Sequence, residues 1–118
     1  MATIFTRIIK GEIPCYKIYE DENYFAFLDI NPLQKGHTLV IPKKEDDYIF
    51  NLDDATYSGL MMTAKKIAAA IKESTNCKRV GVTVLGMEVP HVHIHLVPMN
   101  SEKDMLFSNP KMELSKEE

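Results

Sequence analysis

The chain has 118 residues, of which 45% are hydrophobic, and a formal net charge of −3 at pH 7. This length predicts a single domain over residues 1–118, with enough apolar residues for a core that needs no metal or disulfide. The acidic balance argues against a nucleic-acid partner. The N-terminus has no apolar run of the kind found in signal peptides or membrane spans, so we expect a cytoplasmic protein without a membrane partner.

A short helix and a hairpin are predicted at the start of the chain. Apolar residues recur at helical spacing over residues 4–9, and Gly11 and Pro14 end that helix. Residues 15–21 and 24–30 are predicted to form two strands joined by a tight polar turn. The pair therefore predicts an antiparallel hairpin.

The middle of the chain is predicted to contain a third strand and one long helix. The strand covers residues 37–42, and a polar loop with one helical turn follows it. Apolar residues then repeat at three- and four-residue steps over about residues 54–74. Asp53 or Asp54 is placed to cap this helix.

Two further strands are predicted at residues 78–86 and 91–98, whereas the tail from residue 99 shows no assignable pattern. The order is then a helix, three strands, a long helix and two strands. Such an order is typical of an α+β fold with a mostly antiparallel sheet.

Three of the four histidines stand at alternate positions in the sequence HVHIHLVP, residues 91–98. Alternate side chains of a strand share one face. We therefore expect His91, His93 and His95 on one face of the sheet. The apolar residues between them would pack against the long helix from the other face.

Three interpretations of this row compete. Ordinary strand residues on a solvated face account poorly for three histidines in five residues. A metal site is possible in principle, because His-x-His on a strand binds zinc and His37 offers a further ligand. An anion site with a nucleophile is the third interpretation: imidazole N–H groups bind phosphate oxygens while a neutral ring nitrogen attacks phosphorus. The central residue, His93, is then the attacking one.

The sequence GMEVPHVHIHLVP closely resembles the signature of the histidine triad (HIT) superfamily, in which three histidines alternate with hydrophobic residues. The sequences IFTRIIKGEIP, YEDENYFAFLDINP and KGHTLVIPKK resemble other segments of that family, in the same order. The resemblance runs from about Ile4 to Pro98. It points to the small nucleotide-binding branch of the family.

The resemblance implies a five-stranded antiparallel sheet with two helices, and a homodimer in which the two sheets are continuous. It implies hydrolysis at the α-phosphorus of a nucleotide conjugate, usually a purine one, through a covalent nucleotidyl-histidine. A nucleoside phosphoramidate or a dinucleoside polyphosphate would be the substrate. His93 would be the nucleophile, His91 and His95 would contact the phosphate, and His37 would support the cluster.

The resemblance also implies residues that bind the nucleotide. Asp29 matches the acceptor for the ribose hydroxyls, although a turn residue is an equally good interpretation of its place. The base pocket would be lined by apolar residues that plain core packing explains as well: Phe5, Ile8, Ile13, Phe27 and Ile30.

The phosphate shell departs from the family pattern. Met87 replaces a glutamine of many relatives, Glu88 stands where some carry a hydroxyl residue near the leaving group, and Thr83 is a weak substitute for an asparagine. The cysteines that bind structural zinc in some members are Thr3 and Thr6 here, so we expect no metal and no cofactor. The alternative functions are a nucleotide-binding or sensor module with little turnover and, less favoured, a metalloprotein.

Overall fold

The computed structural model describes residues 3–87 and 89–108. Its helices and strands, in chain order, are α1 (Ile4–Ile9), β1 (Lys17–Glu20), β2 (Tyr24–Leu28), β3 (Thr38–Pro42), the 3-10 turn η1 (Ile49–Asn51), α2 (Asp54–Thr75), β4 (Arg79–Thr83), β5 (Ile94–Met99) and the 3-10 turn η2 (Glu102–Met105). The predicted order of elements is confirmed. The tail that the sequence left unassigned contributes η2.

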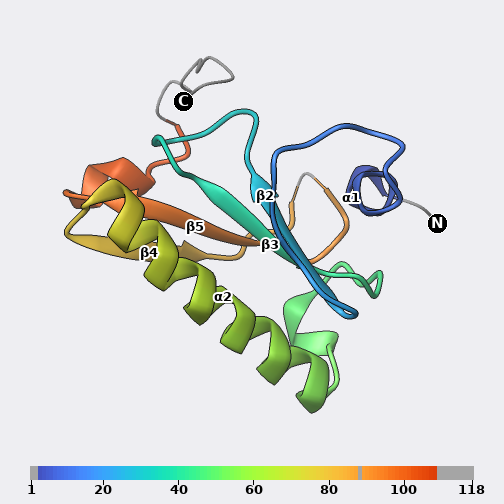
Figure 1. Ribbon diagram of the computed structural model, residues 1–118. Coiled ribbons are helices and arrows are strands. Elements are labelled where there is room, and N and C mark those ends of the chain that lie inside the picture. The colour runs from blue at the N-terminus through green and yellow to red at the C-terminus, as the bar shows by residue number, and fades with distance from the viewer. Residues whose placement is uncertain (1–2, 88, 109–118) are drawn as a thin grey trace.

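The five strands form one sheet in the order β1-β2-β3-β5-β4 (Figure 1). Every neighbouring pair is antiparallel, which confirms the predicted α+β class. The final strand in sequence, β5, is inserted between β3 and β4. This insertion brings the histidine sequence beside the strand that follows His37.

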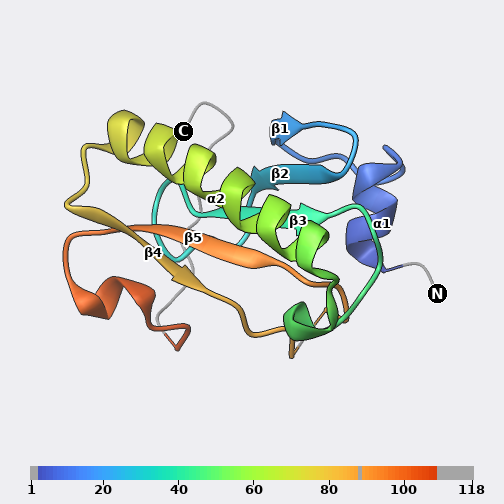
Figure 2. The same cartoon turned by 90° about the horizontal axis from the view of Figure 1, so that it is seen from below.

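The two faces of the sheet carry separate apolar clusters. On one face, α2 runs diagonally across the sheet (Figures 1 and 2) and packs its buried residues against alternate residues of β2, β3 and β5. The intervening residues of β2 and β3 point to the opposite face, where Phe5 and Ile8 of α1 cover them. The period of two along the strands therefore assigns each face to one helix.

Helix α2 begins and ends at clear signals. The Asp53 carboxylate accepts the backbone N–H of Thr56, so Asp53 is the predicted cap that the structure uses. At the other end Asn76 adopts a left-handed conformation with φ 57°, which stops the helix. Among the described residues, no helix is long and apolar enough to cross a membrane.

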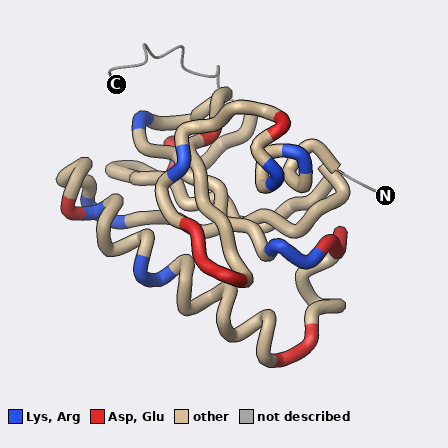
Figure 3. The backbone as a smooth tube through the Cα atoms, turned by 45° about the vertical axis from the view of Figure 1, so that its right-hand side comes forward, with Lys and Arg blue, Asp and Glu red and all other residues tan. Residues whose placement is uncertain are grey.

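Charged residues of both signs are interspersed along the described chain (Figure 3). Several of them form local ion pairs, such as that between Arg7 and Glu12. This distribution along the backbone agrees with the small net charge.

Candidate active site

The histidine sequence enters the sheet later than expected. Strand β5 begins at Ile94, so His91 and His93 precede it and only His95 lies in the ladder. The backbone N–H of Val92 donates to the carbonyl of Asp46 instead of to a strand partner. The prediction of a strand from residue 91 is therefore corrected at its start. The apolar residues between the histidines do pack with α2, as expected.

All four histidines are buried. The exposed fractions are 0% for His91, 6% for His93, 7% for His95 and 1% for His37. The interpretation of ordinary histidines on a solvated face is therefore wrong. Buried imidazoles need hydrogen-bond partners, and these partners determine which ring nitrogen carries the proton.

His93 has its ring oriented by the backbone of its neighbour. Its Nδ1 lies 2.7 Å from the carbonyl oxygen of His91. Because a carbonyl only accepts, Nδ1 carries the proton. In the neutral ring the lone pair is then on Nε2, the nitrogen available to attack an electrophile.

His37 and His95 form a second oriented pair. The backbone N–H of Leu33 donates to Nδ1 of His37 at 2.9 Å, so the proton of His37 lies on Nε2. That Nε2 lies 3.0 Å from Nδ1 of His95 and donates to it. His95 in turn carries its proton on Nε2. Asp29 places a carboxylate oxygen 3.6 Å from His37 Nε2, which favours a proton at that atom.

The same pair bears on the metal alternative. Within the described residues, Asp29, His37 and His95 form the one group of three potential ligands close enough together to hold an ion. However, the Leu33 N–H occupies the lone pair of His37 Nδ1, so Nε2 must keep its proton and has no lone pair for a metal. The hydrogen bonds of this group thus favour a proton between the two rings over an ion.

Both ring nitrogens of His91 make hydrogen bonds that suit the neutral imidazole. Its Nε2 donates to the carbonyl oxygen of Pro42 at 2.8 Å, and its Nδ1 lies 2.9 Å from the hydroxyl of Thr3. Burial away from water lowers the pKa of His91 from its ordinary value of 6.5, against smaller opposing effects of the Pro42 hydrogen bond and the Glu45 charge. The charge of His93 lowers it further.

This lowered pKa predicts a pH dependence of stability. Below about pH 6.5 the unfolded chain protonates His91 more fully than the folded chain does, so the free energy of unfolding falls as the pH falls. One such group contributes at most about 1.4 kcal/mol per pH unit between its two pKa values. Urea unfolding at pH 7.5 and 5.5 measures this loss. His91→Gln, which retains a donor toward Pro42 but does not titrate, should show a smaller loss than the wild type, and an equal loss would contradict the assignment.

Two phenylalanine rings flank the histidine cluster. Phe5 of α1 packs edge-to-face against His93 with ring centroids 4.9 Å apart, and against His91 at 5.8 Å. Phe107 packs edge-to-face against His95 at 4.8 Å, after η2. Asp104 of η2 accepts a hydrogen bond from the side chain of Gln34, which ties this segment to the loop before β3. The sequence did not predict a role for Phe107, because no local pattern marks the tail.

The residues expected to bind a nucleotide lie in different surroundings. Phe5 and Ile8 of α1 are buried together with Phe27 of β2, and Ile13 packs at the edge of the same cluster. Ile30 is 74% exposed and does not belong to that cluster. Asp29 accepts the backbone N–H of Asn31, so it is a turn residue in this structure, whatever its role toward a ribose.

Two of the three residues that depart from the family pattern near the phosphate lie among the described residues. Met87 is exposed, and Thr83 pairs with His95 across β4 and β5. Glu88 lies outside the described residues. Of the two members of this set that the structure describes, Thr83 is thus the one paired with a histidine.

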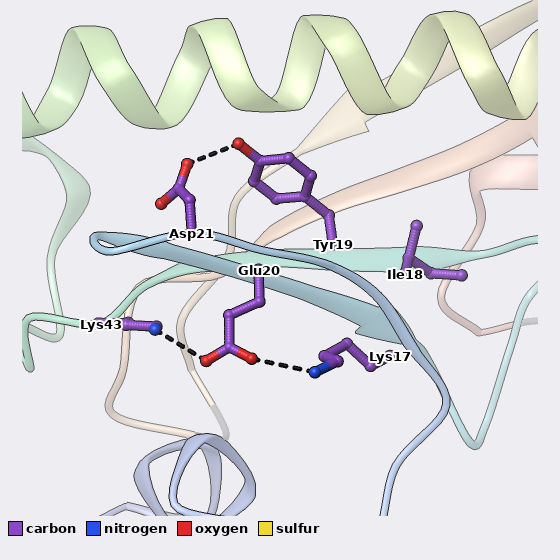
Figure 4. A pocket seen from close by; sticks show the side chains of 6 residues that line it. All are labelled: Lys17, Ile18, Tyr19, Glu20, Asp21 and Lys43. Atoms are coloured by element: carbon purple, nitrogen blue, oxygen red, sulfur yellow. Dashed lines mark hydrogen bonds and ion pairs between the residues drawn. The ribbon is translucent and has the colours of Figure 1, made fainter.

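A separate hollow lies at the outer edge strand β1 (Figure 4). The Glu20 carboxylate binds Lys43 at 2.8 Å and Lys17 at 3.1 Å there, while Tyr19 and Asp21 point to the other side of the strand and bind each other. None of the four histidines lines it. Its charges satisfy one another, so the candidate active site is the histidine cluster.

Comparison with known proteins agrees with this geometry. The HIT domain family model matches residues 10–102. The chain belongs to the HIT family. It is 41% identical over 106 residues to adenosine 5'-monophosphoramidase HNT1 of Saccharomyces cerevisiae, covering 89% of this chain and 67% of that protein. It is 32% identical over 114 residues to adenylylsulfatase HINT3 of Arabidopsis thaliana, covering 92% and 57% respectively.

A solved HIT structure has the same fold. The crystal structure of a HIT family protein from Bacillus subtilis superimposes with a TM-score of 0.83 at 34% identity, over 95% of this chain and 83% of that one. The predicted HIT fold, with its five-stranded antiparallel sheet and two helices, is therefore confirmed.

The zinc position of some HIT proteins has a different chemistry here. Thr3 and Thr6 lie together beside His91 and Glu45, joined by hydrogen bonds. Hydroxyl groups do not supply the thiolates that zinc prefers, so the residues present do not fit a structural zinc ion.

Proposed function

We propose that this HIT protein is a nucleotide hydrolase that cleaves at the α-phosphorus of a purine nucleotide conjugate, such as a nucleoside phosphoramidate or a dinucleoside polyphosphate. The observation that carries the proposal is the 2.7 Å hydrogen bond from His93 Nδ1 to the carbonyl of His91, because it leaves the lone pair on Nε2. The names of the relatives from Saccharomyces cerevisiae and Arabidopsis thaliana support a nucleotide substrate.

The reaction proceeds in two displacements at phosphorus. His93 Nε2 forms a bond to the α-phosphorus while the bond to the leaving group breaks, and the leaving group takes up a proton from solvent. His95, whose Nε2 carries a proton, stabilises the charge on the phosphoryl oxygens. His91, whose two ring nitrogens are engaged by Pro42 and Thr3, orients His93 through its carbonyl. Water then attacks phosphorus, gives up a proton, and releases the nucleoside monophosphate and neutral His93. Asp29 binds the ribose, the five apolar residues named above line the base pocket, and Glu88 lies near the leaving group.

A direct assay tests this function. Purified protein is mixed with adenosine phosphoramidate or diadenosine polyphosphate in the presence of a chelator, and release of AMP is followed by chromatography. We expect release with at least one substrate, and a rapid quench should trap protein carrying one nucleotidyl group. Absence of release from every substrate, together with tight AMP binding, would instead support a nucleotide-binding module with little turnover. One observation favours that alternative: Met87 is exposed and has no amide that could donate to a phosphate.

We also propose that two copies join along β4 into a homodimer with a continuous sheet. The edges of the sheet are β1 and β4. Strand β1 carries a register irregularity and the ion pairs of Glu20, features that discourage strand pairing. Strand β4 pairs regularly with β5 and presents Val82, which is 53% exposed.

Light scattering tests this assembly. The wild type should have twice the chain mass of 13.5 kDa. Val82→Lys should shift it toward the monomer, whereas Ile18→Lys on β1 should leave the dimer intact. A wild-type monomer, or a dimer broken only by Ile18→Lys, would refute the proposed interface.

A further inference from the structure

The first turn of α1 is connected to His91 by side-chain hydrogen bonds. Thr3 caps α1: its Oγ1 accepts the backbone N–H of Thr6 at 3.1 Å. The same Oγ1 lies 2.9 Å from Nδ1 of His91. Because Nε2 of His91 donates to Pro42, Nδ1 of the neutral ring is an acceptor, and the proton in this contact comes from Thr3.

Glu45 determines the direction of these hydrogen bonds. Its Oε1 accepts the hydroxyl of Thr6 at 2.8 Å and the backbone N–H of Thr3 at 3.2 Å. The hydrogen bond from the Thr6 hydroxyl is the largest of several effects that hold the pKa of Glu45 below its usual value. The Glu45 carboxylate therefore stays ionised and accepts hydrogen bonds. The single hydroxyl proton of Thr6 is used on Glu45, and that of Thr3 is left for His91.

This network acts on the same stretch of backbone that orients His93. The carbonyl of His91 accepts Nδ1–H of His93, so any rotation or displacement of His91 moves the acceptor that fixes the second ring. Phe5, two residues after Thr3, packs against His93 itself. The position of α1 and the tautomer of His93 are thus linked through His91.

We propose that Thr3 and Glu45 are positioning residues for the nucleophile. Thr3 donates a hydrogen bond to His91 Nδ1, and Glu45 directs this donation by accepting the Thr6 hydroxyl. Together they hold the His91 carbonyl where it fixes His93 with Nε2 unprotonated. This inference rests on the proposed function for its effect on turnover. Neither residue touches the reacting atoms. Their effect is therefore expected in kcat more than in KM.

Two substitutions at one position separate this role from helix capping. Ser and Asp both cap helices about as well as Thr or better. Ser retains a hydroxyl donor for His91, whereas an ionised Asp has only acceptors to offer. Thr3→Ser should retain most of the wild-type kcat. Thr3→Asp should lower kcat by about 10- to 100-fold with KM nearly unchanged, a range typical of lost positioning.

Imidazole ¹⁵N NMR reports which ring nitrogen of each histidine carries the proton. This signal would stay unchanged if Thr3 only stabilised the fold. In the wild type and in Thr3→Ser, His93 should show a proton on Nδ1 and a bare Nε2. In Thr3→Asp, His91 should gain a proton on Nδ1, and the His93 signals should shift. If Thr3→Asp retains the wild-type His91 and His93 spectra, the proposal is wrong.

A second variant covers the case in which Thr3→Asp does not fold. Thr6→Val preserves the shape of the side chain but frees Glu45 to compete with His91 for the Thr3 hydroxyl. We expect a several-fold lower kcat and a shifted His91 signal, and an unchanged spectrum would overturn the proposal. The spectra report on the network even in a protein that turns nothing over, so failure of the hydrolase proposal and failure of this one are distinguishable.

Discussion

His93→Ala is expected to abolish release of nucleoside monophosphate, with a fall in rate on the order of 10⁴-fold or more, as found when a catalytic nucleophile is removed. The reason is that the lone pair on His93 Nε2 is the one placed for attack: His91 uses its Nε2 proton on Pro42, and His95 carries a proton on its own Nε2. The measurement is single-turnover release of AMP from adenosine phosphoramidate. The covalent nucleotidyl adduct should also be missing from the mass spectrum.

The control for this experiment uses the same protein. His93→Gly leaves room for free imidazole, which should restore part of the rate if the missing group is a nucleophile. A thermal melt close to that of the wild type would show that the loss is chemical. AMP release by His93→Ala at the wild-type rate would refute the assignment of the nucleophile.

Leu60→Ala is expected to lower the free energy of unfolding by about 2–5 kcal/mol, the usual cost of emptying a fully buried leucine site. Leu60 has no exposed surface and lies in the cluster that α2 forms with Ile94 and Leu96. Urea unfolding at pH 7.5 gives the value. The substitution tests directly whether the face of β5 opposite the imidazoles rests on this helix.

Met62→Ala is the matched control, because Met62 stands on the same helix but is 62% exposed. Its effect should stay within about 0.5 kcal/mol, as for surface positions in general. Equal costs for the two substitutions would mean that α2 does not bury the face that the structure assigns to it.

The sequence predicted the elements whose signals are local. Helix α2 was identified from its apolar period and from a cap at Asp53 or Asp54. The structure uses Asp53 and ends the helix within one residue of the predicted end. The alternation around His93 correctly separated the imidazoles from the residues that pack on α2. Short-range patterns are reliable where they coincide with burial.

The parts that the sequence did not predict depend on distant partners. Strand β5 starts late because Val92 bonds to Asp46 of another loop. Glu45 lies in the polar loop after the third strand, for which the sequence predicted no role, and its contacts with α1 arise only from the fold. Phe107 follows a segment without periodicity, and its place beside His95 is set by tertiary contacts.

The hydrogen bond between Thr3 and His91 joins groups 88 positions apart, and that between His37 and His95 spans 58. Contacts of such long range form slowly, because the entropy of closing large loops opposes them. During synthesis on a ribosome the histidine cluster cannot assemble until almost the entire described chain has emerged. A newly made molecule would thus become catalytically competent only late in its folding.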